Sequence, residues 1–378
     1  MRRDLLMEPE EFSRRVLLAV TGLSPQVVTE TLYGLARQRR DRVPTEVHVI
    51  TTEEGAERVR LALLSREPGW FRRLCEDLEL TGLRFGNDSI HVLRDVSGTP
   101  LADIRTPEDN ERAADFITEK VREFTADPES ALHVSIAGGR KTMGYYAGYA
   151  LSLFGRPQDR LSHVLVSEPF ESSWDFFYPT PYSRVITTRN DKLADTADAS
   201  VTLAEIPFVS LRDGLPTRLV EGGAQLSETV AAARRALEPP ELVIDLAGRC
   251  LEASGERLPM APAELAFYAL FARKRQVSGH ALRRSDPELS GPFLAEYQRI
   301  VGPMSGDLER AEEALQNGMD ADYFDQRKAR TNATLRQHLG PQLARLYAIH
   351  ADGKRDGRFS LRLEPEAIRF DAVQDPGK

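Results

Sequence analysis

The sequence contains only two cysteines, Cys75 and Cys250, and they lie far apart in the chain. This small number argues against a disulfide framework or a cysteine-based metal site, so we expect two buried free thiols. No apolar run approaches the roughly 20 residues that a membrane span requires. Residues 1–15 are charged where a signal peptide would be apolar. We therefore expect a cytoplasmic protein without a membrane segment.

Several motifs of nucleotide and metal chemistry are also missing. The sequence has no GxGxxG fingerprint, no P-loop glycine–lysine spacing and no GxSxG motif. Its seven histidines show no metal-ligand spacing, so we expect neither a cofactor nor a metal. The net charge of −8 argues against binding nucleic acid over the whole surface, although a local basic site is compatible with it.

The first half of the chain alternates short apolar runs with longer helical patterns. Strands are predicted at residues 16–20, 47–50, 90–93, 132–136 and 163–166, and helices at 27–38, 53–64, 108–124 and from 142 onward. This alternation predicts an α/β fold with a Rossmann-like, doubly wound and mostly parallel sheet. Ligands of such sheets bind beyond the carboxyl ends of the strands, near a switch in strand order.

The pattern changes after residue 167. We predict an α/β domain over residues 1–190, a connector over 191–240 and a winged-helix domain over 241–378. Residues 174–178 and 183–187 are expected to be extended. In the last part, helices are predicted at 263–274, 306–316 and 332–346, the last of them interrupted at Gly340 and Pro341. They precede two strands that flank a charged tip, which is the order of a winged helix.

The most informative local pattern is the run from Gly138 to Thr142, which follows the fourth strand. A strand that ends at Gly138 and Gly139 and restarts as a helix leaves unpaired N–H groups at the helix start. Those groups attract anions, and Arg140 and Lys141 add positive charge. The run favours a phosphate site, with an exposed basic helix start as the simpler alternative.

A second turn follows the first strand and contains Thr21, Gly22, Ser24 and Gln26. Gly22 permits a tight turn. Ser24 either caps the helix that Pro25 begins or directs its hydroxyl at a ligand above the sheet. This turn is weak evidence by itself.

Three further patterns each leave two interpretations open. Arg105 could complete a phosphate or base contact, while Asp109 and Asn110 after it could simply cap a helix. The aromatic run 174–178 could stack on bases or form a small core. The basic residues after position 326 could contact DNA or form a solvated face. The candidates for nucleic-acid contacts are Arg327, Lys328, Arg330, Arg336, Lys354 and Arg355.

Taken together, residues 21–30, 103–106, 133–143 and 152–166 resemble a CARF domain, the CRISPR-associated Rossmann-fold sensor of type III systems. The resemblance covers roughly residues 14–185, and the remainder resembles the winged helix-turn-helix that often follows such sensors. The resemblance implies a pocket for cyclic oligoadenylate. It would be lined by Thr21, Gly22, Ser24 and Gln26 of the first turn and by Gly138, Gly139, Arg140, Lys141 and Thr142 of the second.

The resemblance also implies a homodimer, because a ring with two-fold symmetry is best met by an interface that presents each turn twice. We expect a ring nuclease that cleaves the cyclic messenger, most readily cyclic tetra-adenylate, without a metal. Lys141 would stabilise charge on the phosphate, and Ser24 or Thr21 would orient the ribose. The alternative is a transcription regulator that senses the ring and binds DNA. An arginine–four-residue–histidine motif, typical of ribonucleases fused to these sensors, is absent.

Overall fold

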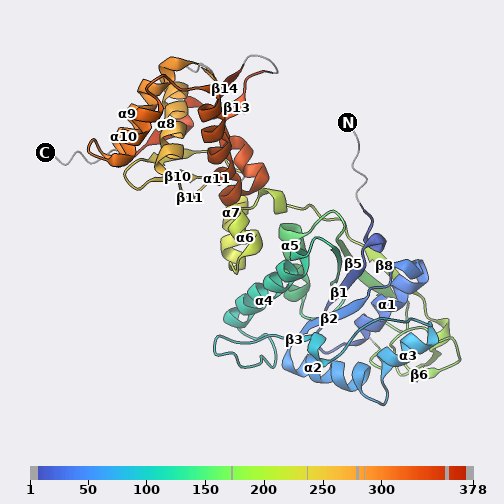
Figure 1. Cartoon of the computed structure of the whole chain (residues 1–378). Coiled ribbons are helices and arrows are strands. Elements are labelled where there is room, and N and C mark those ends of the chain that lie inside the picture. The colour runs from blue at the N-terminus through green and yellow to red at the C-terminus, as the bar shows by residue number, and fades with distance from the viewer. Residues whose placement is uncertain are drawn as a thin grey trace. The chain divides into compact units, whose positions relative to one another are not determined.

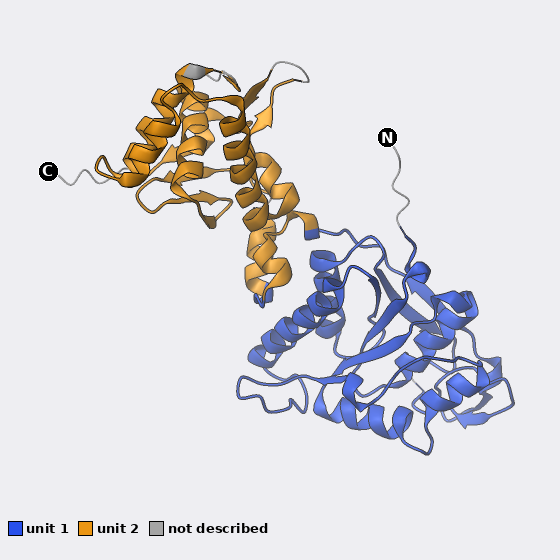
Figure 2. Ribbon diagram, viewed as in Figure 1, with its two compact units in different colours: residues 1–212, 223–226 blue, residues 213–222, 227–378 orange. Residues whose placement is uncertain are grey.

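The computed structural model describes residues 7–171, 173–235, 237–277, 281–284, 286–353 and 357–371. The chain divides into two compact units (Figure 2). The first contains residues 1–212 and 223–226, and the second contains residues 213–222 and 227–378.

The first unit is built on a six-stranded sheet with the order β3-β2-β1-β4-β5-β8. Its strands are β1 (Arg14–Val20), β2 (Glu46–Thr51), β3 (Ile90–Val92), β4 (Ser130–Ser135), β5 (Arg160–Val166) and β8 (Val201–Glu205). The first five run parallel, and β8 pairs antiparallel to β5 at the edge. The prediction of an α/β fold with a mostly parallel sheet is confirmed, and the arrangement is compatible with a Rossmann-like fold.

Helices cover both faces of this sheet (Figure 1). They are α1 (Gln26–Gln38), α2 (Glu53–Val59), α3 (Trp70–Asp77), α4 (Pro107–Ala126) and α5 (Lys141–Phe154). Helices α4 and α5 pack against each other on one face, and α1 and α3 lie together on the other. A π-helical turn, Arg60–Leu64, continues α2.

Strand β1 is buried on both sides, which explains its continuous apolar sequence. Every side chain from Val16 to Val20 is at most 1% exposed. Leu17 and Ala19 belong to the core that β1 shares with α1 and α2. The strand order reverses between β1 and β4, because β1 leads through α1 to β2 on one side and β4 leads through α5 to β5 on the other. The two turns singled out in the sequence follow these two strands.

The segments after β5 differ from the prediction. Residues 174–178 form turns and coil and not a strand. Residues 183–187 contribute only β6 (Val185–Thr187), which pairs with β7 (Leu193–Asp195). Strand β8 comes from the stretch predicted as a connector. Only Leu203 of β8 is buried, so its sequence carries a weak apolar signal, as expected of an edge strand.

The second unit combines helices with two small sheets. Its helices are α6 (Thr217–Glu221), α7 (Leu226–Arg235), α8 (Pro262–Val277), α9 (Ser290–Val301), α10 (Gly306–Ala314) and α11 (Ala321–Tyr347). One sheet has the order β11-β10-β9-β15 and the other β12-β14-β13. Their strands are β9 (Leu242–Asp245), β10 (Cys250–Ala253), β11 (Glu256–Pro259), β12 (Leu282–Arg283), β13 (His350–Ala351), β14 (Arg358–Ser360) and β15 (Ile368–Phe370).

Two features predicted for this unit are present. Helix α11 is kinked at Gly340, where φ is +76°, next to Pro341. Strands β13 and β14 pair antiparallel after α11. The winged-helix assignment itself stays a prediction.

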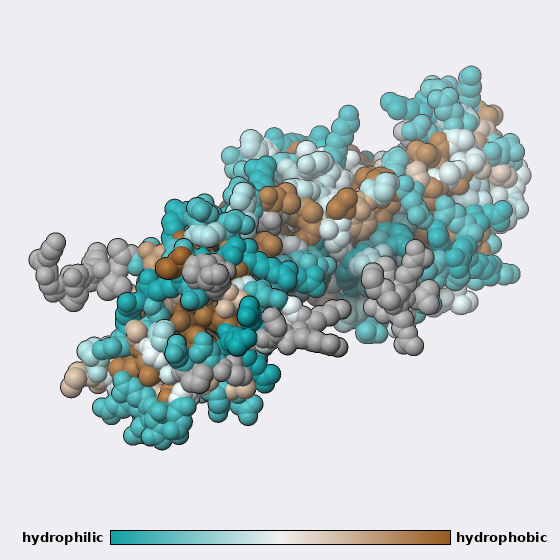
Figure 3. All heavy atoms as spheres, turned by 90° about the horizontal axis from the view of Figure 1, so that it is seen from above, coloured by the Kyte–Doolittle hydropathy of each residue, from teal (hydrophilic) through white to brown (hydrophobic). Residues whose placement is uncertain are grey.

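The surface seen in Figure 3 is largely hydrophilic, with apolar residues in patches between hydrophilic ones. Helices in the described part of the chain are all too short or too polar for a membrane span. Both cysteines are free thiols. Cys250 is buried, whereas Cys75 is partly exposed, contrary to the expectation that both would be buried.

Candidate functional site

The turn after β1 and the turn after β4 touch each other. A Cβ atom added to Gly22 would lie 3.2 Å from the Cα atom of Gly139, and one added to Gly138 would lie 3.0 Å from the carbonyl oxygen of Val20. Gly139 also has a φ of +82°, which side chains rarely allow. Glycine therefore permits this close approach, and the two predicted turns form one surface at the carboxyl ends of β1 and β4.

Helix α5 begins at Lys141, directly after this surface. Arg140 occupies the N-cap position, and no side chain there accepts a hydrogen bond from the first helical N–H groups. Lys141 and Thr142 are exposed, and within the described ranges neither side chain has a hydrogen-bond or ion-pair partner. The uncapped N–H groups lie at the positive end of the helix dipole and beside an unpaired lysine. Together these groups favour the binding of an anion.

Arg140 is held by the carboxylate of Asp103, a residue of the 103–106 run for which the sequence predicted no role. Its Nε donates to Oδ1 of Asp103 at 3.0 Å, and its Nη2 donates to the other carboxylate oxygen. The Nε atom of Arg105 lies 3.5 Å from the same carboxylate. The hydrogen bond from Arg140 is the main cause of the lowered pKa of Asp103. Asp103 therefore stays ionised and brings the two predicted arginines together.

The two hydroxyls predicted to orient a ribose differ in exposure. Thr21 is fully buried, and its Oγ1 has no hydrogen-bond partner in the part of the chain that the structure describes. Ser24 is exposed and lies at the wall of a cavity. Helix α1 begins at Gln26 without a side-chain cap, so the interpretation of Ser24 as an N-cap is wrong. Its hydroxyl is available to a ligand.

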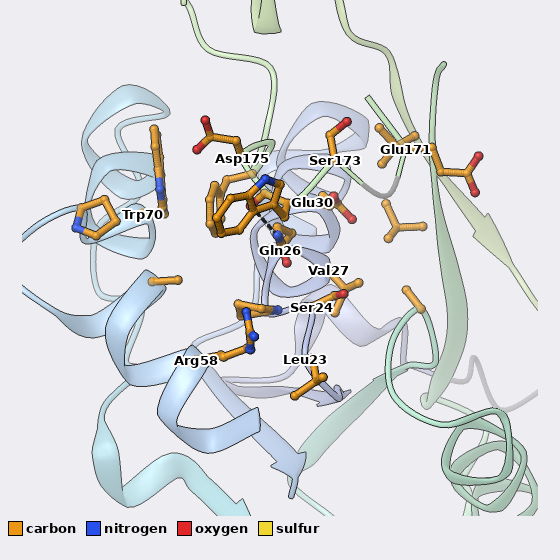
Figure 4. A pocket seen from close by; sticks show the side chains of 18 of the residues that line it. Leu23, Ser24, Gln26, Val27, Glu30, Arg58, Trp70, Glu171, Ser173 and Asp175 are labelled. Atoms are coloured by element: carbon orange, nitrogen blue, oxygen red, sulfur yellow. Dashed lines mark hydrogen bonds between the residues drawn. The ribbon is translucent and has the colours of Figure 1, made fainter. Parts of the chain in front are cut away.

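A cavity of about 470 Å³ opens beside Ser24 (Figure 4). Its walls come from the turn after β1, from α1, from residues 58–62 and Trp70, from the end of β5 and from residues around 171–177. The volume lies in the range of small-molecule sites. Ala137, the residue before the Gly138–Gly139 turn, also lines it, whereas Arg140 and Lys141 do not. The anion surface and the cavity are thus neighbours.

Two of the α1 side chains that line this cavity are polar, Gln26 and Glu30. They are one helical turn apart and 8% and 9% exposed. The Nε2 atom of Gln26 donates to the main-chain oxygen of Trp174 at 2.7 Å, and its Oε1 is buried without a partner. Burial, and after it the charge of Glu171, raises the pKa of Glu30 to about 8. Glu30 is therefore largely protonated at neutral pH.

The predicted aromatic run separates into two groups. Phe176 and Tyr178 are buried in cores, as the small-core interpretation expects. Trp174 is 77% exposed and lines the cavity. Across the cavity, Trp70 stacks on Phe177 with ring centroids 4.9 Å apart. The cavity therefore has one firmly packed aromatic wall and one exposed indole.

Comparison with family models identifies the family of the chain. The model of the CRISPR-associated protein NE0113 family matches residues 24–239, more than half of the chain. The chain belongs to this family. A search among curated proteins found no match. In this NE0113-family protein the matched residues include Ser24, the side chains of α1 that face the cavity, the Gly138–Gly139 turn and α5, whereas Thr21 and Gly22 precede them.

The second unit of the NE0113-family protein carries the cations predicted to contact nucleic acid. Arg327 pairs with Glu264 at 2.7 Å, and Lys328 pairs with Asp325 at 3.0 Å. Arg330 and Arg336 are exposed, and Arg330 lies 3.9 Å from Glu264. Lys354 and Arg355 lie outside the described residues. Arg327 and Lys328 are thus engaged in ion pairs within their own unit.

Proposed function

We propose that this CRISPR-associated protein binds cyclic oligoadenylate at the surface formed by the two turns and cleaves it as a ring nuclease. The observation that carries the proposal is the contact between Gly22 and Gly139 beside the uncapped start of α5. At this point main-chain N–H groups and the unpaired Lys141 converge where the strand order switches. Such a surface suits the phosphates of a small ribonucleotide.

The same groups suit a cleavage reaction that needs only the nucleophile of the RNA. The 2′-oxygen of one ribose attacks the adjacent phosphorus, and the bond to the 5′-oxygen breaks. The proton lost from the 2′-hydroxyl is balanced by the one gained on the 5′-oxygen. Lys141 would stabilise the charge that develops on the phosphate, and Ser24 would hold the ribose in line. The products are linear adenylates that end in a 2′,3′-cyclic phosphate.

We further propose that two copies of the chain enclose the ring. A cyclic tetra-adenylate or hexa-adenylate has two-fold symmetry, and a symmetric dimer would present both turns twice. Each phosphate could then meet an N–H cluster or a cation. In this arrangement the first unit would bind and cleave the ring, and membership of the NE0113 family supports a role in CRISPR-associated defence.

The test is to incubate the purified protein with cyclic tetra-adenylate or cyclic hexa-adenylate in EDTA and to separate the products by chromatography. Linear products are expected, and Lys141→Ala should slow their formation by about a hundredfold or more, as for loss of one charge-stabilising group. Lys192→Ala, which removes an exposed lysine from the β6–β7 turn, is the matched control and should cleave normally.

Two results would contradict the proposal. If both rings bind but stay intact, the protein is a sensor and not a nuclease. If neither ring binds, the assignment of the two turns as its binding surface is wrong.

A further inference from the structure

The cavity beside α1 contains a buried acceptor without a donor. The carbonyl oxygen of Trp174 can only accept a hydrogen bond, so the Gln26 amide must turn its NH₂ group toward it. The Oε1 atom of Gln26 is thereby directed away from Trp174, and no group of the described residues donates a hydrogen bond to it. Leaving a buried acceptor unpaired has a free-energy cost, because the atom gives up its hydrogen bonds to water and gains none in return. A ligand that brings a donor to this atom would recover that cost.

Glu30 adds a second polar group to the same wall. No donor within the described ranges reaches its carboxyl group, although the residue is only 9% exposed. Burial and the charge of Glu171 favour the protonated form. A protonated carboxyl group presents an O–H donor beside a C=O acceptor. Together, Gln26 and Glu30 offer two acceptors and one donor over one turn of helix (Figure 4).

This set of groups complements one edge of adenine. The exocyclic amino group of adenine has two hydrogens, one for the carbonyl of Glu30 and one for Oε1 of Gln26. The ring nitrogen next to it accepts the hydrogen of the Glu30 carboxyl group. Hypoxanthine and guanine carry an oxygen in place of the amino group, and that oxygen would face the unpaired oxygen of Gln26. The Oε1 atom of Gln26 therefore distinguishes adenine, which has an amino group at this position, from bases that have an oxygen there.

The remaining walls suit a flat aromatic ring. Trp174 is 77% exposed at the cavity and offers a face for stacking, while Val27 and Trp70 supply apolar surface. Ser24 and Ala137 border the cavity on the side of the two turns. A base in the cavity would thus leave its sugar and phosphate next to the anion surface at α5.

We propose that this cavity receives an adenine base, with Oε1 of Gln26 and the carboxyl group of Glu30 binding its amino group and the adjacent ring nitrogen. That the base belongs to a cyclic oligoadenylate rests on the proposed function. The selectivity for adenine does not, because it follows from the cavity itself.

The experiment is calorimetric titration of the full chain with AMP and with IMP, which differ in the group at the discriminating position. The wild type should bind AMP at least tenfold more tightly than IMP. Gln26→Leu should abolish this preference, because it removes the oxygen that discriminates between the two bases. Glu30→Leu should weaken the binding of AMP and of IMP, since a protonated carboxyl group can pair with either base, and Glu30→Gln should retain both binding and preference. Gln38→Leu, on the exposed end of α1, is the matched control.

Equal binding of AMP and IMP by the wild type would overturn the inference. So would a Gln26→Leu variant that is folded by circular dichroism and retains the preference. Titration with cyclic tetra-adenylate and cyclic hexa-adenylate separates the two proposals. If AMP is preferred but neither ring binds, only the proposed function fails. If a ring binds but Glu30→Leu leaves its affinity unchanged, only the base pocket fails.

Discussion

At the scale of single residues, glycine decides whether the two turns can meet. Gly139 and Gly98 have nearly the same φ, +82° and +83°, but their surroundings differ. An added Cβ at Gly139 would contact Met143 and Val20 at 3.3 Å, whereas at Gly98 nothing lies within 4 Å. Comparing substitutions at these two glycines therefore distinguishes the effect of backbone strain from the effect of disturbing the contact between the two turns.

Gly139→Ala and Gly98→Ala should each destabilise the fold by about 1–2 kcal/mol, because both place a side chain at positive φ. Only Gly139→Ala should also weaken binding of cyclic oligoadenylate, since it moves the turn after β4. Urea denaturation measures the first effect and calorimetry the second. Equal loss of ring binding in both variants would mean that the contact between the turns is not what matters.

The titration of Glu30 makes the free energy of unfolding depend on pH, and the direction of this dependence can be stated. Its pKa is about 8 in the folded chain, against an ordinary value of 4.5 for a glutamate side chain. Between these values the folded state binds more protons than the unfolded state, so stability falls as the pH rises. The charged or titratable groups Arg58, His163, Glu171 and Asp175 face the same cavity and will modulate the effect.

Glu30→Gln removes this titration. The variant should gain stability over the wild type as the pH rises from 5 to about 9, with an upper limit of roughly 5 kcal/mol from about 1.4 kcal/mol per pKa unit. Urea denaturation at a series of pH values measures the difference. A stability difference that stays constant with pH would contradict the burial of an uncharged Glu30.

At the scale of elements, the start of α4 fixes the main chain of Arg105, the arginine whose side chain lies near Asp103. Thr106 is the N-cap of α4, and its Oγ1 accepts from the N–H of Asp109 at 3.1 Å. In return, Asp109 accepts from the main-chain N–H groups of Arg105 and Thr106, each at 3.0 Å. The interpretation of Asp109 as a helix-capping residue is confirmed, and the same cap fixes the main chain of Arg105.

Thr106→Ala should destabilise the first unit by about 1 kcal/mol, the usual cost of losing an N-cap hydroxyl. Thr106→Ser keeps the acceptor and should stay close to the wild type. Thermal unfolding followed by circular dichroism provides the measurement. If serine is as destabilising as alanine, the capping hydrogen bond contributes nothing measurable.

At the scale of the whole molecule, the chain passes from one unit to the other more than once. Residues 223–226 belong to the first unit although residues 213–222 belong to the second. Hydrogen bonds attach this return segment to α4. Arg122 donates to the main-chain oxygen of Ala224 at 3.2 Å, and the N–H of Leu226 donates to Asp115 at 2.9 Å.

A chain of residues 1–226 should therefore fold and bind the ring with an affinity close to that of the full protein, because both turns and the cavity lie within the first unit. A chain of residues 1–212 should be less stable, since it lacks the segment attached to α4. Thermal melts compare the two, and calorimetry measures binding. A folded 1–226 fragment that no longer binds the ring would show that the second unit contributes to the site.

Local sequence pattern by itself determined the alternation of strands and helices and the two turns after β1 and β4. These depend on apolar periodicity and on glycines, which are local properties. The break at Gly340 in α11 was predictable for the same reason. The tertiary structure alone decided that Asp103 pairs with Arg140, 37 residues away, and that Gln26 and Glu30 face a cavity closed by residues near 171–177. Burial and pairing of polar groups depend on which distant segments meet, and that information lies in no single stretch of sequence.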